Sequence, residues 1–190
     1  MSTTGAVFST TSQAISETPW SDDAWTTPNN ILADDAATAN VTAASFDNND
    51  QTYVLKAYGF NFNSIPDGST INGVICKVNA WYRGGQGSGS FDLMQLLNTS
   101  KAKVGTNQCA TVVALASNNT TVITKGSATD LWGNALTAAW VKNSNFGVAM
   151  GILATAANAD VDIDYVTLDI DYTAPSPSAL KRRRILTMYT

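Results

Sequence analysis

The sequence contains no histidine, only two cysteines and few charged side chains. Of its 190 residues, 14% are charged, against about a quarter in an average globular protein. The absence of histidine excludes Ser-His-Asp and Cys-His nucleophile pairs, a histidine acid or base, and metal sites with imidazole ligands. Cys76 and Cys109 are too few and too far apart for a metal knuckle or a redox pair, so we expect two buried thiols.

Long hydrophobic runs are also missing. No apolar run approaches the roughly 18 residues of a membrane-spanning helix, and MSTTGAVFSTT at the N-terminus lacks the basic and apolar parts of a secretory signal. A chain of this length buries about 70% of its unfolded surface and can form a core without disulfides or metal. We therefore expect one domain with terminal segments, no membrane insertion, no metal and no cofactor.

The few charges are distributed unevenly. Residues 1–180 carry 7 basic and 15 acidic side chains, a net charge of −8, whereas residues 181–190 carry +4. An acidic domain repels nucleic acid, so any contact with a polyanion would have to come from the tail. We expect no direct nucleic-acid binding by the body of the protein.

Short strand patterns fill most of the sequence. The clearest alternate apolar and polar residues or end in turn residues such as Pro, Asp and Gly: Gln51–Phe62, Ile71–Tyr82, Phe91–Leu97, Asn145–Ala154 and Ala159–Tyr172. Only Asn134–Lys142 tolerates a helical period, as a turn or one brief helix. We predict an all-β fold, a two-sheet antiparallel β-sandwich of jelly-roll type with extended N- and C-terminal arms.

The last strand pattern changes phase in its middle. Val161 and Ile163 are apolar at odd positions, whereas Val166, Leu168 and Ile170 are apolar at even ones. Because side chains alternate with a period of two, one residue must be inserted between the two halves. The pattern predicts a β-bulge or a sharp bend near Tyr165–Val166.

Three segments follow from these patterns. We predict an N-terminal arm or first strand over 1–18, the sandwich over 19–173, and a Pro/Ser linker with a basic and apolar arm over 174–190. A basic stretch followed by apolar residues suits docking onto a partner. The residues expected to anchor it are Lys181, Arg182, Arg183, Arg184, Ile185, Leu186, Met188 and Tyr189.

Several acidic and glycine-rich motifs have plain structural interpretations. Asp160, Asp162 and Asp164 have a spacing of two and could bind calcium, but we favour a solvent-facing strand edge because carboxylates splayed along a strand converge poorly. The pairs Asp22-Asp23 and Asp34-Asp35 could serve a glycosidase, but such pairs are common in turns. The loop 83–90 has no P-loop ending, so we expect a flexible connection rather than a phosphate site.

Aromatic residues leave one ligand surface to consider. Most of the five tryptophans should pack in or at the rim of the core. Trp81 alternates with the apolar residues of its strand and is the first to test for exposure. A carbohydrate or receptor would then contact Trp81, Tyr82 and Arg83.

Three motifs in order resemble a known family. They are PWSDDAWTTPNN followed by ADD, then LKAYGFNFNSIPDGSTINGV, and finally DLWG with NFGV and a closing strand ending in Asp-Tyr-Thr. Over residues 19–173 this order resembles β-sandwich virion proteins of tailed bacteriophages, described as minor structural, decoration or tail-associated proteins. The resemblance brings no catalytic residues with it.

The resemblance implies a non-enzymatic virion protein, either on the capsid surface or at the tail. Such a subunit would be assembled in the host cytoplasm and contact other virion proteins, and we expect a homo-oligomer, most plausibly a trimer. Two other functions stay open. One is a carbohydrate- or receptor-binding module of a tail or fibre that recognises a host glycan. The other is a glycan-cleaving enzyme that uses an Asp pair.

Overall fold

The computed structural model describes residues 1–42, 46–83, 87–118 and 121–176. Within them the chain is almost entirely β, with one 3-10 turn, η1 (Pro28–Ile31), and one helical turn, α1 (Ala138–Val141). The brief helix predicted within 134–142 is thereby confirmed. None of the helices in this part of the chain is long and apolar enough to cross a bilayer.

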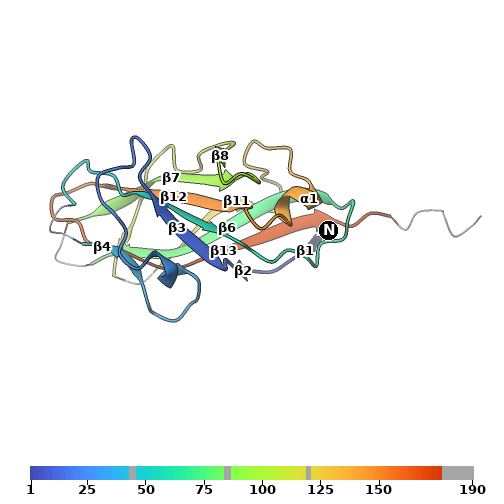
Figure 1. Ribbon diagram of the computed structural model, residues 1–190, viewed down its shortest axis with the longest axis horizontal. Coiled ribbons are helices and arrows are strands. Elements are labelled where there is room, and N and C mark those ends of the chain that lie inside the picture. Colours follow the sequence, from blue (N-terminus) through green and yellow to red (C-terminus); the bar gives the residue numbers. More distant parts are fainter. Residues whose placement is uncertain (43–45, 84–86, 119–120, 177–190) are drawn as a thin grey trace, which may run out of the picture.

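The strands form two sheets that pack face to face (Figure 1). The first sheet contains β1 (Ser2–Thr3), β2 (Val7–Phe8), β4 (Ala39–Val41), β6 (Thr70–Tyr82), β10 (Ala116–Ser117), β11 (Val122–Ser127) and β13 (Val161–Thr173). The second contains β3 (Thr11–Ile15), β5 (Val54–Tyr58), β7 (Gly89–Leu97), β8 (Lys103–Val104), β9 (Val113–Ala114) and β12 (Gly147–Ala154). The predicted β-sandwich is confirmed.

The chain passes back and forth between the two sheets. β5 lies in the second sheet, β6 in the first and β7 in the second, and β11, β12 and β13 alternate in the same way. This alternation is typical of jelly-roll sandwiches. Among the described strands, β10 pairs with β6 in parallel, and the other pairs are antiparallel. β6 and β13 pair along almost their whole length and form the centre of the first sheet.

The predicted bulge lies at Asp164. Ile163 pairs with Ala80 and Tyr165 pairs with the adjacent Asn79, so Asp164 is the extra residue on β13. The insertion lets both halves of the strand turn their apolar side chains inward. The change of phase in the sequence therefore corresponds to a real irregularity of pairing.

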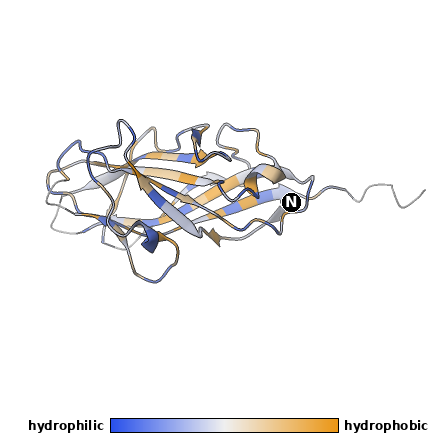
Figure 2. Cartoon of the chain, viewed as in Figure 1, coloured by the Kyte–Doolittle hydropathy of each residue, from blue (hydrophilic) through white to orange (hydrophobic). Residues whose placement is uncertain are grey.

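The inner faces of the sheets form the core, and hydrophobic residues recur along the strands of both sheets (Figure 2). Val78 pairs with Val166 and Cys76 pairs with Leu168, and all four side chains are fully buried. Cys76 and Cys109 are buried free thiols, as predicted. Burial raises the pKa of both, that of Cys109 to about 11, so both thiols stay protonated at neutral pH.

A smaller apolar cluster lies on the outer face of the second sheet. Val54, Leu93, Leu97 and Ala149 are buried there under Trp20. The Trp20 indole donates to the Asp92 carboxylate at 3.0 Å, and the Lys103 ammonium lies 4.2 Å from its ring centroid. Trp20 therefore covers the back of this sheet and is not a free aromatic platform.

Most of the N-terminal segment belongs to the sandwich. β1 and β2 pair with β13, and β3 pairs with β5, so residues 2–15 take the strand alternative of the prediction. On the C-terminal side of β13, residues 174–176 lie outside the sandwich and are exposed. The eight residues expected to anchor the C-terminal arm lie outside the described residues.

Candidate functional site

The predicted ligand surface at Trp81, Tyr82 and Arg83 is not formed as one face. Because side chains alternate along a strand, Tyr82 packs against the core while Trp81 turns to the outer face of the first sheet, where it is half-buried. The Arg83 guanidinium is held by carboxylates. Trp81 and Tyr82 therefore point to opposite faces of the sheet, and binding of a glycan by Trp81, Tyr82 and Arg83 stays a prediction.

Those carboxylates overturn the expectation of a solvent-facing acidic edge. β13 lies between β6 and β4 in the sheet, and Asp162 is only 1% exposed. Arg83 donates from Nε and Nη2 to the two oxygens of Asp162 at 2.7 and 2.9 Å, and Nη1 lies 3.4 Å from Asp160. Thr38 donates a further hydrogen bond to Asp162 at 2.7 Å. Asp160 and Asp162 therefore pair with Arg83 and do not face solvent.

Asp164, at the bulge, is also buried, with 2% exposure. Within the described residues, Oδ1 of the Asp164 carboxylate has no hydrogen-bond donor. Burial, reinforced by the charge of Asp34, raises the pKa of Asp164. No group of three or more His, Cys, Asp and Glu side chains in the described ranges could hold a metal ion, so the three aspartates do not form a calcium site there.

Replacing Asp164 with asparagine is expected to stabilise the protein at pH 7 by about 1 kcal/mol, because it removes a buried charge with one unpartnered oxygen. A carboxyl whose pKa is raised by folding loses stability as pH rises through that pKa. The advantage of the variant should therefore shrink between pH 7 and pH 4, as measured by urea unfolding. Asp67→Asn is the control, because the pairing of Asp67 with Lys142 lowers the pKa of its carboxyl. This variant is therefore expected to change the free energy of unfolding at pH 7 in the opposite direction, towards lower stability. An unchanged difference across this range would contradict the prediction.

The other acidic pairs serve loops. The Asp22 carboxylate accepts from Gln51 N–H at 2.8 Å, and the Asp35 carboxylate accepts from Ala37 N–H at 3.0 Å. Only the Asp35 contact, two residues along the chain, is the local turn role expected of such residues. The Asp22 contact joins two loops that are 29 residues apart, and Asp23 is buried. Residues 84–86 of the glycine-rich loop lie outside the described residues.

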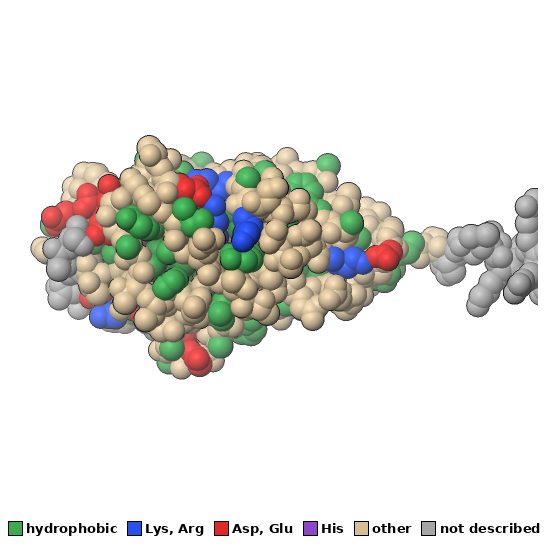
Figure 3. Space-filling model, in the orientation of Figure 1, with side chains coloured by type: hydrophobic (Ala, Val, Ile, Leu, Met, Phe, Trp, Pro, Cys, Tyr) green, Lys and Arg blue, Asp and Glu red, His purple; other side chains and the backbone are tan. Residues whose placement is uncertain are grey.

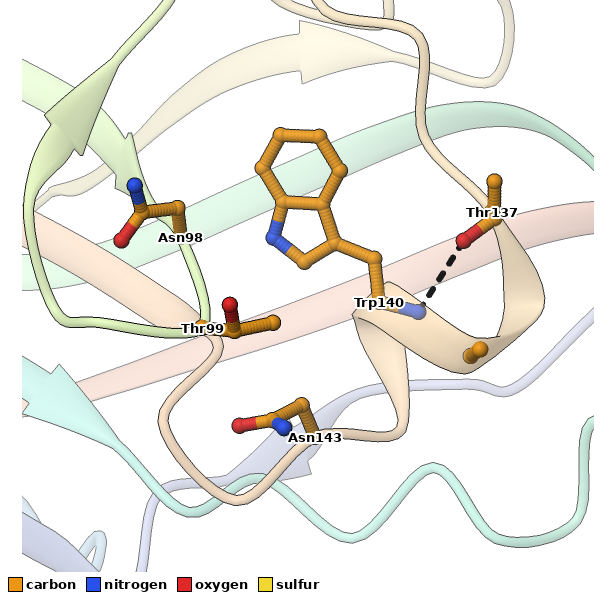
Figure 4. Close-up of a pocket in the computed structure, with 6 residues that line it drawn as sticks. Asn98, Thr99, Thr137, Trp140 and Asn143 are labelled. Atoms are coloured by element: carbon orange, nitrogen blue, oxygen red, sulfur yellow. Dashed lines mark hydrogen bonds between the residues drawn. The ribbon is translucent and has the colours of Figure 1, made fainter.

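One pocket lies beside α1, between this helical turn and the turn that follows β7 (Figure 4). Its volume is about 470 Å³, within the range of small-molecule sites. The lining residues are Asn98, Thr99, Thr137, Ala139, Trp140 and Asn143. We call this the Trp140 pocket.

The wall of the Trp140 pocket is fixed by the helical turn. Thr137 caps α1, because its side-chain oxygen accepts from Trp140 N–H at 3.1 Å. Ala138 and Val141 of the same turn are buried in the core, which leaves Trp140 half-buried beside the pocket. The indole ring therefore stands on an anchored element rather than on a free loop.

Sequence reasoning missed this pocket. It singled out Trp81, because alternation along a strand can be read from the sequence, and it placed Trp140 on a brief helix without a role. Asn98 and Trp140 are 42 residues apart, and no local pattern connects them. Only the packing of α1 against the end of β7 brings them together.

Comparisons with known proteins add little to this geometry. No protein-family model matches the chain, and no curated protein matches it. Among solved structures, the CBM22-1 xylan-binding domain of Xyn10C from Paenibacillus barcinonensis is similar over 86% of this chain and 95% of that one, with 6% identity and a TM-score of 0.33. A likeness at this level carries no conclusion about ligand, partner or activity.

Proposed function

We propose that this protein is a non-enzymatic auxiliary subunit of a tailed-phage virion, on the capsid surface or at the tail, attached to its neighbours through its terminal segments. The observation that carries the proposal is the pairing of the first strand with the end of the last one. Ser2 pairs with Tyr172 and Thr3 pairs with Asp171, so the chain begins beside the point where it leaves the last strand (Figure 1).

This arrangement gives the molecule two different ends. At one end lie the N-terminus and the exposed residues 174–176, which lead into the basic arm. Acidic side chains gather at the opposite end (Figure 3). In the loops there, the Asp22 carboxylate accepts a hydrogen bond from Gln51 N–H, and the Asp47 carboxylate accepts one from Asn158 N–H. A subunit held by its terminal end would project the other end away from the surface that holds it.

The charge distribution supports the same attachment. The arm carries +4 and the rest of the chain −8, so the arm can pair with acidic surface on a neighbouring subunit, including a second copy of this protein. The order of motifs over residues 19–173, which resembles tailed-phage β-sandwich proteins, supports a place in the virion and assembly in the host cytoplasm. A closed homo-oligomer, most plausibly a trimer, is the assembly that we propose.

Deletion of residues 175–190 is expected to lower incorporation into particles at least about tenfold, since the arm supplies the anchoring contacts. The deletion leaves β13 intact, because this strand ends at Thr173. Occupancy is measured by quantitative mass spectrometry of purified particles, and circular dichroism of the free variant checks its fold.

Two matched variants separate the contributions of the arm. One replaces its four basic residues with glutamine, and the other replaces Ile185, Leu186, Met188 and Tyr189 with serine. We expect a salt-dependent loss of occupancy for the first and a salt-independent loss for the second. Undiminished occupancy of the folded deletion variant would overturn the anchoring role.

A further inference from the structure

We propose that the Trp140 pocket binds a neutral sugar residue, with the indole of Trp140 as its apolar platform and the side-chain amides of Asn98 and Asn143 as hydrogen-bond donors. This inference does not rest on the virion proposal, because it concerns the isolated domain. It also places the site away from Trp81, at the end of β7 rather than at the end of β6.

The amide orientations are set by the backbone around each asparagine. Asn98 Oδ1 accepts from the N–H groups of Ser100 at 2.8 Å and Ala102 at 3.0 Å. Asn143 Oδ1 accepts from Asn145 N–H at 2.9 Å. With both oxygens occupied, the NH₂ group of each of these two lining residues is the atom left to donate to a ligand.

The indole of Trp140 adds a third donor. Its Nε1 is buried, and within the described part of the chain it meets no acceptor. Figure 4 shows the nitrogen-bearing edge of the ring turned toward Asn98 and Thr99. A buried N–H group without a partner costs about 1–3 kcal/mol, and a ligand oxygen that displaces the Asn98 side chain from this edge would relieve this cost.

The composition of the wall selects the ligand class. None of the six lining residues is charged, so an ionic ligand would find no counter-charge among them. The donors require a ligand with several oxygen acceptors, and the ring of Trp140 and the Cβ of Ala139 require an apolar face. A pyranose ring offers both, since its hydroxyls lie around an apolar face of C–H groups, and about 470 Å³ gives it room.

The test uses the full chain and defined probes. Saturation-transfer NMR is recorded with the methyl glycosides of glucose, galactose, mannose and N-acetylglucosamine, and with glucuronic acid as the charged comparison. We expect transfer to at least one neutral glycoside and none to glucuronic acid. A neutral glycan array then extends the search to longer chains carrying the same sugar.

Variants assign the binding to this pocket. Trp140→Ala should abolish saturation transfer, and Trp140→Phe, which keeps a ring but removes the N–H, should weaken binding about 2- to 10-fold. Asn98→Asp keeps the oxygen that accepts from Ser100 and Ala102 but removes the NH₂ donor, so it should weaken binding by a similar factor. Trp81→Ala is the matched control at the other end of the sandwich and should bind like the wild type.

Clear outcomes would overturn the proposal. They are the absence of binding to every neutral glycoside and glycan, binding to glucuronic acid alone, and undiminished binding by Trp140→Ala. Circular dichroism and thermal melting of each variant show that it is folded, and Asn98→Asp still tests the site if Trp140→Ala proves unfolded. Loss of sugar binding together with normal incorporation into particles would separate this inference from the virion proposal.

Discussion

Replacing Arg83 with methionine is expected to destabilise the fold by about 2 kcal/mol, measured by urea unfolding at pH 7. The substitution keeps most of the aliphatic length of the side chain but leaves Asp162, 1% exposed, without its cation. Breaking a buried ion pair from one side typically costs about 3–5 kcal/mol. Because the Arg83 side chain is itself 46% exposed, water screens part of this cost and the lower figure applies.

A double-mutant cycle identifies the cause of this loss. Asp162→Asn in the Arg83→Met background should restore most of the lost free energy of unfolding, since no buried carboxylate then needs a partner. Lys77→Met is the matched control, because Lys77 is an exposed cation on β6, the strand that ends one residue before Arg83, and it should change stability by less than about 0.5 kcal/mol. Equal losses for Arg83→Met and Lys77→Met would contradict a buried pair.

Trp132→Ala is expected to cost about 4 kcal/mol in the free energy of unfolding, the larger of the two effects. Trp132 is fully buried, and its indole donates to the Val74 carbonyl at 3.0 Å. Removing it leaves a cavity in the core and an unpaired carbonyl on β6. The measurement is equilibrium denaturation, with Trp81→Ala as the half-buried comparison, for which we expect a much smaller loss.

A second variant tests the same contact without removing the ring. Gly126 has a φ of +77°, and a Cβ added there would lie 2.5 Å from Trp132 Nε1 and 2.1 Å from the Val74 carbonyl oxygen. Gly126→Ala should therefore displace the indole and strain the backbone. If Trp132→Ala lowered the free energy of unfolding no more than Trp81→Ala, the prediction that Trp132 stabilises the core would be wrong.

The strand pattern of the sequence anticipated most of the sandwich. Expected strands over Ile71–Tyr82 and Ala159–Tyr172 correspond closely to β6 and β13, and the change of phase near Tyr165 corresponds to the extra residue Asp164. The expected strand Gln51–Phe62 is shorter, ending at Tyr58. Phe60 and Phe62 are nevertheless buried, because an apolar run predicts burial more reliably than it predicts strand pairing.

The prediction that Asp160, Asp162 and Asp164 face solvent was wrong. Alternation correctly placed Asp162 on the outer face of the sheet, but whether that face meets water depends on what lies over it. Thr38 and Arg83 approach from other elements and bury the carboxylate. Such coverage cannot be read from the period of one strand, because it depends on contacts between residues far apart in the sequence.

The sequence by itself determined the all-β class, the inward faces of the long strands and the bulge, because each of these depends on the local alternation of side chains along a strand. Only the tertiary structure decided which outer faces are covered, that β1 pairs with the end of β13, and that Asn98, Trp140 and Asn143 line one pocket. These features depend on strand order and on packing between distant segments. Composition limits the chemistry of this protein, whereas packing between distant segments decides which residues line the Trp140 pocket.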